Sequence, residues 1–413
     1  MNTDSVKSWE IQSSTGKHFD VLNGVRGIAI LMVVFYHGIY TNPAAGLASR
    51  IVGGLNGAGW MGVPLFFVLS GFLISYPFFR RRATDVRSWY TPGYVRRRVG
   101  KIVPPFYLSI VIFATYYFLR FRNPAYLHAA WQWALGLPNF VPEAIDFKAA
   151  YWSLIVEAHF YILLPLVFWV TRGFKVRYAT ACLFLILFMA PLAVRQFTWP
   201  SHEYRNSIWF LMHRFPCQLD LFAWGVLFSG LFVSLSAMRD QLRNLSLLGY
   251  AGLVLLVATM ALYALWVPLF GDGDQSSRWN SEVFQFLPGA AAFLILFFIF
   301  DPTCIGSRVL SNSWLGFIGL VSYEWFLFHE PIVIGFRDLF GKTGGNLILY
   351  TAKTILPLVL SFGLSVIVYR YFSLPLLNRI RGKTPQPRKP TTASGNDGTG
   401  KPLAPSTTHA VPQ

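Results

Sequence analysis

The chain has 413 residues, of which 54% are hydrophobic and only 13% are charged, and its mean hydropathy is +0.46. Soluble domains carry about 25% charged residues, so the composition excludes a soluble globular protein and indicates a polytopic membrane protein. The formal net charge of +17 does not require a nucleic-acid partner, because membrane proteins concentrate Lys and Arg in their cytoplasmic loops.

The apolar stretches predict an all-α membrane helix bundle of about ten transmembrane helices. The predicted spans are roughly 21–41, 59–79, 102–120, 152–171, 178–197, 208–233, 245–267, 283–300, 313–336 and 347–371. Basic residues are dense before the first span, between 80 and 101 and after the last span, and they are sparse in the alternate loops. This asymmetry predicts that both termini are cytoplasmic.

The same pattern divides the chain into three parts. We predict a cytoplasmic N-terminal segment at 1–20 and a membrane domain at 21–375. The segment 376–413 is rich in Pro, Thr, Ser and Gly and lacks apolar periodicity, so it is predicted to be a disordered cytoplasmic tail.

The first span carries two ionisable residues, Arg26 and His37, after a plausible N-cap at Asp20. Eleven helical steps bring His37 to within about 20° of the face that holds Arg26, and about 16 Å further along the axis. Ionisable groups inside a bilayer are costly and mark a functional site by default. The alternative is a snorkelling Arg beside a packed His.

In the second span, Ser70 and Gly71 favour close helix packing. A nucleophilic Ser70 is the lesser alternative, because no base and no elbow motif accompany it in the sequence. The segment 80–101 then holds the densest charge in the chain. It predicts the positive-inside signal and contact with anionic membrane lipids. A second, compatible interpretation is a phosphate-binding cluster at the cytoplasmic mouth of the third span, formed by Arg96, Arg98 and Lys101.

Further ionisable residues reach the outer half of the membrane from other spans. Glu157 in the fourth span lies at a depth similar to that of His37, and the ninth span carries His329 and Glu330. His159 points about 200° away from Glu157 and is predicted to be structural. A His with a carboxylate nearby can act as a general base toward a hydroxyl.

Two other features of the sequence are predicted to be structural. Asp220 in the sixth span needs a partner, and Arg26 or Arg214 could form the ion pair. The three cysteines have neither the spacing of a metal site nor that of a disulfide framework, and we expect no metal.

Five motifs in order point to one family: the Arg26-to-His37 element, FFVLSGFLI, the basic run before VPPFY, YWSLIVEAHFY and SYEWFLFHEP. Over about residues 19–375 the chain resembles the acyltransferase family 3 membrane proteins, which include bacterial O-antigen, exopolysaccharide and Nod-factor O-acetylases and macrolide acylases. The resemblance implies transfer of an acyl group, usually acetyl, from acyl-CoA to a hydroxyl, most often of a sugar. It also implies a multi-pass protein of the bacterial inner (plasma) membrane.

Carried over by motif, the resemblance makes Arg26 and His37 the essential pair and Glu157 the carboxylate of the WSLxxE element. We predict that His37 is the general base and that Glu157 orients its imidazole. The competing assignment gives the base role to His329. The resemblance further implies two binding sets, which are Arg96, Arg98 and Lys101 for the CoA phosphates, and Tyr323 and His329 for the acceptor.

The chain departs from the family pattern at two positions. Lys101 stands where an Arg is common, which weakens bidentate phosphate binding there, and Phe326 replaces a Tyr. Beyond these motifs, the sequence after 375 does not resemble the hydrolase-like domain that some members carry. The sequence therefore leaves open who positions the acceptor.

The implied partners are a carbohydrate or glycosylated acceptor, free or lipid-linked, and membrane lipids, with no nucleic acid. The sequence leaves the acceptor, the acyl length and the oligomeric state open. The alternative function is a transporter or flippase of a lipid-linked sugar or small solute, since paired ionisable residues and Pro-broken helices fit that class too.

Overall fold

The computed structural model describes residues 20–38, 47–139, 150–198, 215–270, 278–340 and 347–381. Within these ranges all regular structure is helical. Ten helices there are long and apolar enough to cross a membrane, and each predicted span has a counterpart among them: Asp20–Gly38, Ile51–Thr84, Tyr94–Phe121, Tyr151–Val170, Val176–Phe197, Phe215–Met238, Asp240–Leu265, Val283–Phe300, Ser313–Leu339 and Thr354–Ile380. The fold class predicted from the sequence is confirmed.

The elements follow one another along the chain with short connections. The first half contains α2 (Asp20–Gly38), α3 (Leu47–Gly57), η2 (Ala58–Met61), α4 (Gly62–Thr84), α5 (Tyr94–Phe121), α6 (Ala125–Ala134), η3 (Leu137–Asn139), α7 (Tyr151–Val170) and α8 (Val176–Thr198). The second half contains η4 (Phe215–Gln218), α10 (Leu219–Leu235), η5 (Ser236–Leu245), α11 (Ser246–Phe270), α12 (Arg278–Ile295), η7 (Leu296–Phe300), α13 (Ile305–Leu310), α14 (Ser313–Phe340), α15 (Leu347–Val368), η8 (Tyr369–Ser373) and α16 (Leu374–Arg381).

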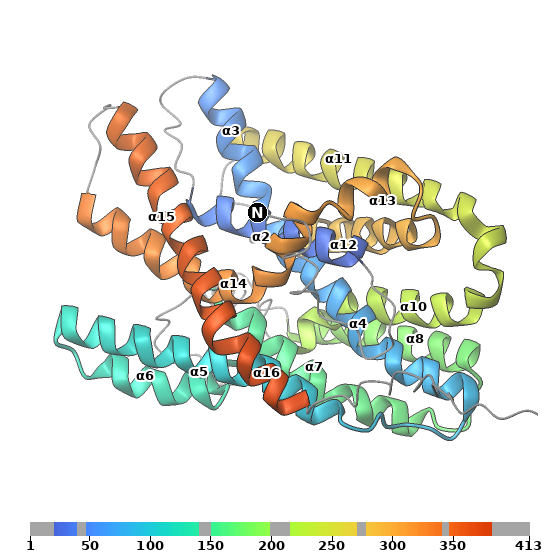
Figure 1. Cartoon of the computed structure of the whole chain (residues 1–413). Coiled ribbons are helices and arrows are strands. Elements are labelled where there is room, and N and C mark those ends of the chain that lie inside the picture. The colour runs from blue at the N-terminus through green and yellow to red at the C-terminus, as the bar shows by residue number, and fades with distance from the viewer. Residues whose placement is uncertain are drawn as a thin grey trace, which may run out of the picture.

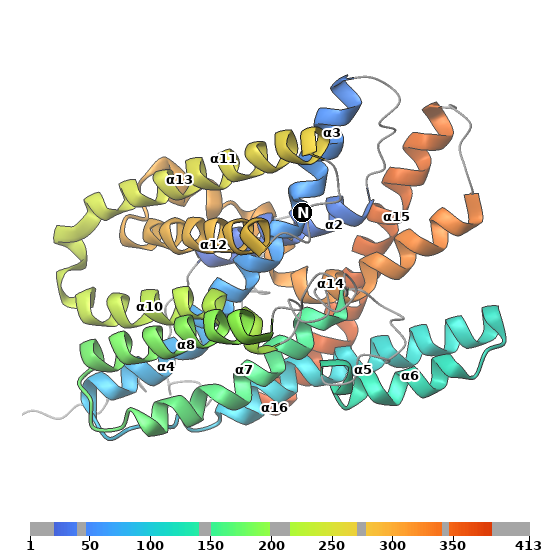
Figure 2. The same cartoon turned by 180° about the vertical axis from the view of Figure 1, so that it is seen from behind.

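Helix α2 lies among the other helices and packs along α14 on one side and α4 on another. In both views the α5–α6 hairpin and the α14–α15 hairpin project on the same side, away from α8, α10 and α13 (Figures 1 and 2). The N-terminal third of the chain thus supplies the centre of the assembly, and the later helices surround it.

Glycines permit the closest approach of α14 to α2. A Cβ added to Gly319 would lie 1.9 Å from the Asn23 carbonyl oxygen, and one added to Gly27 would lie 2.4 Å from the Leu315 carbonyl oxygen. Small residues let membrane helices pack backbone to backbone. Because α2 and α14 run in the same direction here, residues late in α2 meet residues late in α14.

The predicted close packing at Gly71 is also confirmed. A Cβ on Gly71 would lie 2.3 Å from the Phe222 carbonyl oxygen, and one on Gly225 of α10 would lie 2.0 Å from that of Val68. Next to this contact the Phe67 and Phe222 rings stack with centroids 4.7 Å apart. These contacts fix α4 against α10 and so set where Ser70 points.

The basic segment 80–101 is mostly helical, since α4 and α5 leave only 85–93 between them. Arg82, assigned by the sequence to a solvated charge cluster, is instead fully buried. Its guanidinium donates to the Phe168 carbonyl at 2.6 Å and to the Thr171 carbonyl at 3.1 Å. Arg82 therefore caps the C-terminal end of α7, where a cation is favoured.

The predicted outer segments are only partly described. The last helix, α16, reaches Arg381 and thus includes the first residues of the predicted tail 376–413. The rest of that tail and residues 1–19 lie outside the described residues.

Candidate active site

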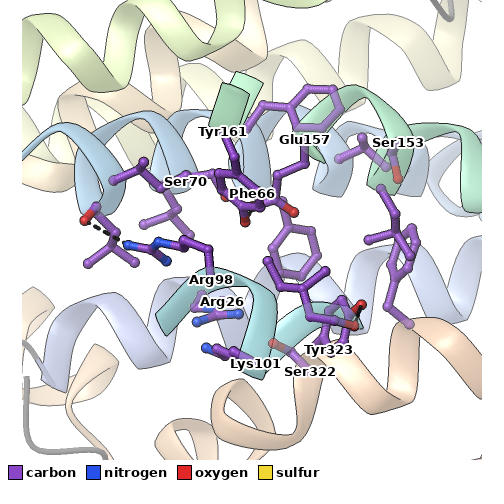
Figure 3. A pocket seen from close by; sticks show the side chains of 18 residues that line it. Arg26, Phe66, Ser70, Arg98, Lys101, Ser153, Glu157, Tyr161, Ser322 and Tyr323 are labelled. Carbon is purple, nitrogen blue, oxygen red and sulfur yellow. Dashed lines mark hydrogen bonds between the residues drawn. The ribbon is translucent and has the colours of Figure 1, made fainter. Parts of the chain in front are cut away.

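A cavity opens between α2, α4, α5, α7 and α14, with an empty volume of about 740 Å³ that includes its mouth. Its wall combines apolar side chains with charged and hydroxyl-bearing ones (Figure 3). The polar members are Arg26, Ser70, Arg98, Lys101, Ser153, Glu157, Tyr161, Ser322 and Tyr323. The site thus draws on helices that are far apart in the sequence.

Three cations gather on one side of this cavity, Arg26 from α2 and Arg98 and Lys101 from α5 (Figure 3). Arg98 and Lys101 share a helix face because they are three residues apart. Arg96 lies about 200° around the helix from Arg98, is exposed and does not line the cavity. The structure therefore brings together two of the three predicted phosphate-binding residues and separates the third.

Two of these cations keep donors available for a ligand. Arg26 makes no hydrogen bond to any residue in the described ranges. Arg98 has one long contact of 3.4 Å, to the Leu73 carbonyl oxygen, and lies 5.7 Å from the centre of the Tyr161 ring. A guanidinium has five N–H donors, so a partly buried one without protein acceptors is suited to an anion.

Glu157 of α7 also lines the cavity, where it interacts electrostatically with Arg26. It accepts a hydrogen bond from the Ser70 hydroxyl and another from the Tyr161 hydroxyl at 2.6 Å. Sequence reasoning missed Tyr161, although its position four residues after Glu157 on one helix was a usable signal. Ser70, predicted as a packing residue, lies in the cavity wall as well.

His37 and His329 form a separate pair outside the cavity lining. His37 Nδ1 lies 3.2 Å from His329 Nε2, and the ring centroids are 5.0 Å apart. The structure thus corrects the expectation that Glu157 orients His37, because the partner of the His37 imidazole is His329. The parallel packing of α2 and α14 produces this pair, and their distance in the chain hid it.

Phe326 stands between the cavity and the histidine pair. It lines the cavity, and its ring centroid lies 5.8 Å from that of His329 and 6.3 Å from that of Phe66. Phe66 lines the cavity too. The aromatic pair Phe66 and Phe326 therefore forms the wall that a reacting group would have to pass to reach His37.

The other ninth-span residues hold helices together. Tyr323 lines the cavity, and its hydroxyl donates to the Ile102 carbonyl of α5 at 2.8 Å. Glu330 is buried and accepts the Ala150 backbone N–H at 2.8 Å. A carboxylate at the start of α7 stabilises that helix end, so we assign Glu330 a structural contact.

Asp220 does form an ion pair within the membrane domain, but with a partner other than the two predicted. Arg195 Nη2 lies 2.8 Å from Asp220 Oδ2, and both side chains are buried. Gln285 donates to Asp220 Oδ1 at 3.0 Å and to the Cys217 carbonyl at 3.1 Å. Arg26 points into the cavity instead, and Arg214 lies outside the described residues.

In the described part of the chain, no three His, Cys, Asp or Glu side chains come together as a metal site. What the site offers is a cationic pocket next to one carboxylate, and a histidine pair beyond an aromatic wall.

The fold and this pocket define a multi-pass membrane protein with an intramembrane site suited to an anionic ligand. A family model described as an acyltransferase domain, Acyl_transf_3, matches residues 19–370. The chain therefore belongs to this acyltransferase family.

Three relatives illustrate the range of the similarity. The O-acetyltransferase OatA of Staphylococcus aureus (strain NCTC 8325 / PS 47) is 23% identical over 399 residues, which cover 91% of this chain and 60% of OatA. "Putative acetyltransferase ORF330" of Acidianus two-tailed virus is 23% identical over 75% of this chain and 82% of its own length. "Putative O-acetyltransferase SACOL0978" of Staphylococcus aureus (strain COL) is 21% identical over 76% of this chain and 50% of its own.

The chain thus spans less than two thirds of the length of OatA. No solved structure matches it.

Proposed function

We propose that this protein is a membrane O-acyltransferase that moves an acyl group, most simply acetyl, from acyl-CoA to a hydroxyl of a carbohydrate or glycosylated acceptor. One observation carries the proposal: Arg26, Arg98 and Lys101 line a single cavity that also holds Glu157, inside a domain of an acyltransferase family. The relatives named as O-acetyltransferases support acetyl as the group and oxygen as its acceptor.

The cations suit the phosphate-bearing end of CoA. Charge-assisted bonds from Arg and Lys to phosphate are among the stronger hydrogen bonds in proteins. From the level of Arg26 to that of His37 is about 16 Å along α2, a distance within reach of an extended pantetheine arm. In this arrangement the thioester lies beyond Phe66 and Phe326, next to the histidine pair.

His37 is the general base in this proposal. It takes the proton of the acceptor hydroxyl as the oxygen attacks the thioester carbonyl. The new carbon–oxygen bond forms, the carbon–sulfur bond breaks, and the proton passes from His37 to the departing CoA sulfur. The products are an O-acyl ester and CoA thiol, so atoms and charge balance. A positioned base of this kind contributes about 10²–10⁴-fold to the rate.

We place the protein in the bacterial plasma membrane with both termini cytoplasmic, on the strength of the charge asymmetry. Ten crossings would leave the two ends of the chain on the same side. Reporter fusions after 90, 175, 240 and 307 should report cytoplasm, and fusions after 123 and 275 should report the outside. If the fusions after 90 and 275 report the same compartment, the topology is wrong.

The function is tested on purified protein in lipid nanodiscs. We expect CoA to bind, measured by calorimetry, and 3′-dephospho-CoA to bind more weakly if the cations hold that phosphate. We also expect radiolabel from [acetyl-¹⁴C]acetyl-CoA to appear as an ester on one of a panel of hexose and N-acetylhexosamine glycosides. A transporter would leave the thioester intact, so the absence of CoA binding and of label transfer would overturn the proposal.

A further inference from the structure

The protons on the two histidines can be assigned from their acceptors. His329 is fully buried, and its Nδ1 lies 3.0 Å from the Trp325 carbonyl oxygen and 2.9 Å from that of Phe326. A carbonyl oxygen only accepts hydrogen bonds. His329 Nδ1 therefore carries a proton and donates it to the backbone of its own helix.

The same argument applies to His37. Its Nδ1 lies 2.9 Å from the Val33 carbonyl oxygen, one turn earlier on α2, so Nδ1 again carries the proton. Two N–H groups cannot face each other across the 3.2 Å between His37 Nδ1 and His329 Nε2. His329 Nε2 must therefore present its lone pair, and His37 Nδ1–H is shared between that lone pair and the Val33 carbonyl.

This network determines the state of the remaining nitrogen. With its proton on Nδ1, a neutral His37 has its lone pair on Nε2. Nε2 is then the atom of His37 that is able to accept a proton. The opposite tautomer would place a lone pair of His37 against two acceptors, the Val33 oxygen and His329 Nε2, which is unfavourable.

We propose that His329 is a positioning residue that holds His37 as the Nδ1–H tautomer, so that His37 Nε2 is the proton acceptor of the acyl transfer; this inference rests on the proposed function. When Nε2 gains the acceptor's proton, the His37 ring becomes a cation. Its Nδ1–H then makes a charge-assisted bond to His329 Nε2, which is stronger than the bond in the neutral state. The stabilisation appears as the proton transfers.

His329 does not pass the proton onward. Its own Nδ1–H faces two backbone carbonyls, which accept a hydrogen bond but do not take a proton at neutral pH. The transferred proton stays on His37 until the CoA sulfur receives it. The structure therefore gives the base role to His37 and the orienting role to His329, and not the reverse.

The experiment compares two side chains that differ by one methylene, His329→Gln and His329→Asn. Both amides can donate to the Trp325 and Phe326 carbonyls. Only Gln is long enough to place an oxygen where His329 Nε2 accepts from His37. We expect kcat of His329→Gln to stay within about tenfold of wild type and kcat of His329→Asn to fall by about 100-fold. The KM for acetyl-CoA should be unchanged in both variants, because His329 does not line the cavity.

The outcomes separate this inference from the proposed function. Wild-type protein that neither binds CoA nor transfers label defeats the proposed function. If wild type transfers label, an Asn variant as active as wild type overturns the positioning role. Equal loss in Gln and Asn together with a raised donor KM also overturns it, because that pattern is one of general disruption. CoA binding and the unfolding temperature show whether each variant is folded.

Discussion

Two buried arginine sites in this membrane domain differ in one respect, the supply of protein acceptors. Arg195 donates to Asp220 at 2.8 Å and to the Cys217 carbonyl at 2.6 Å, so its charge is neutralised within the protein. Arg26 and Arg98 face a cavity, and Arg26 has no hydrogen-bond acceptor among the described residues. A charge in a membrane protein is costly unless something compensates it, so the first site is complete and the second is suited to an anionic ligand.

The comparison separates residues that determine stability from residues that determine activity. Variants of the network around Arg195 should unfold the protein more easily without changing the chemistry of the folded fraction. Variants around the cavity and the histidine pair should do the opposite. The predictions below test this division, starting with the largest effect.

His37→Gln should lower kcat by about 10²–10⁴-fold, because it removes the proton acceptor while filling much of the same space. CoA binding should be retained, since His37 does not line the cavity. Single-turnover transfer of labelled acetyl measures the chemical step, and thermal unfolding in nanodiscs serves as the control. Full single-turnover activity in His37→Gln would assign the base to another residue.

Arg195→Leu or Asp220→Leu alone should destabilise the protein by about 3–5 kcal/mol, because either change leaves an unpaired buried charge. The double variant should be more stable than either single one, because it removes both charges together. Denaturant unfolding of all four proteins gives the coupling free energy. Donor KM per folded molecule should not change, and a raised donor KM in Asp220→Leu would connect this network to the cavity.

Arg98→Ala should raise the KM for acetyl-CoA by about 10-fold to 100-fold, the equivalent of one or two charge-assisted hydrogen bonds. The matched control is Arg96→Ala, which removes the same charge from an exposed position outside the cavity. Steady-state kinetics at varied donor concentration should separate the two variants. Equal effects of both would indicate a diffuse surface potential rather than a binding contact.

Ser70→Ala should lower kcat/KM by less than about tenfold, because Glu157 loses one hydrogen-bond donor and keeps Tyr161. A nucleophilic Ser70 would instead make the loss several orders of magnitude larger. The same label-transfer assay distinguishes these cases. Mass spectrometry of protein incubated with acetyl-CoA alone should show no acetyl ester on Ser70.

The sequence by itself determined the membrane class, the ten spans and the placement of ionisable residues inside them. The physical reason is that the bilayer permits few solutions, so a long apolar stretch almost dictates a spanning helix. Helix geometry also placed Arg26 and His37 on one stripe of α2. The motifs in order indicated the family, which the match over residues 19–370 then showed.

Helical periodicity held more information about the basic cluster than its overall charge did. The spacing of Arg98 and Lys101 puts them on one face of α5, whereas Arg96 falls on another. The sequence prediction grouped all three by charge alone. Assigning faces would have separated Arg96, which is exposed, from the two residues that line the cavity.

Only the tertiary structure decided which groups are partners. The packing of α14 on α2 joins His37 to His329, and the packing of α7 on α4 joins Glu157 to Ser70. Depth along a helix is readable from sequence, but the direction in which a helix presents a side chain to its neighbours depends on rotation and crossing. Small residues such as Gly319 fix both of these through backbone contacts. For this reason two groups at similar depth, His37 and Glu157, belong to different sites.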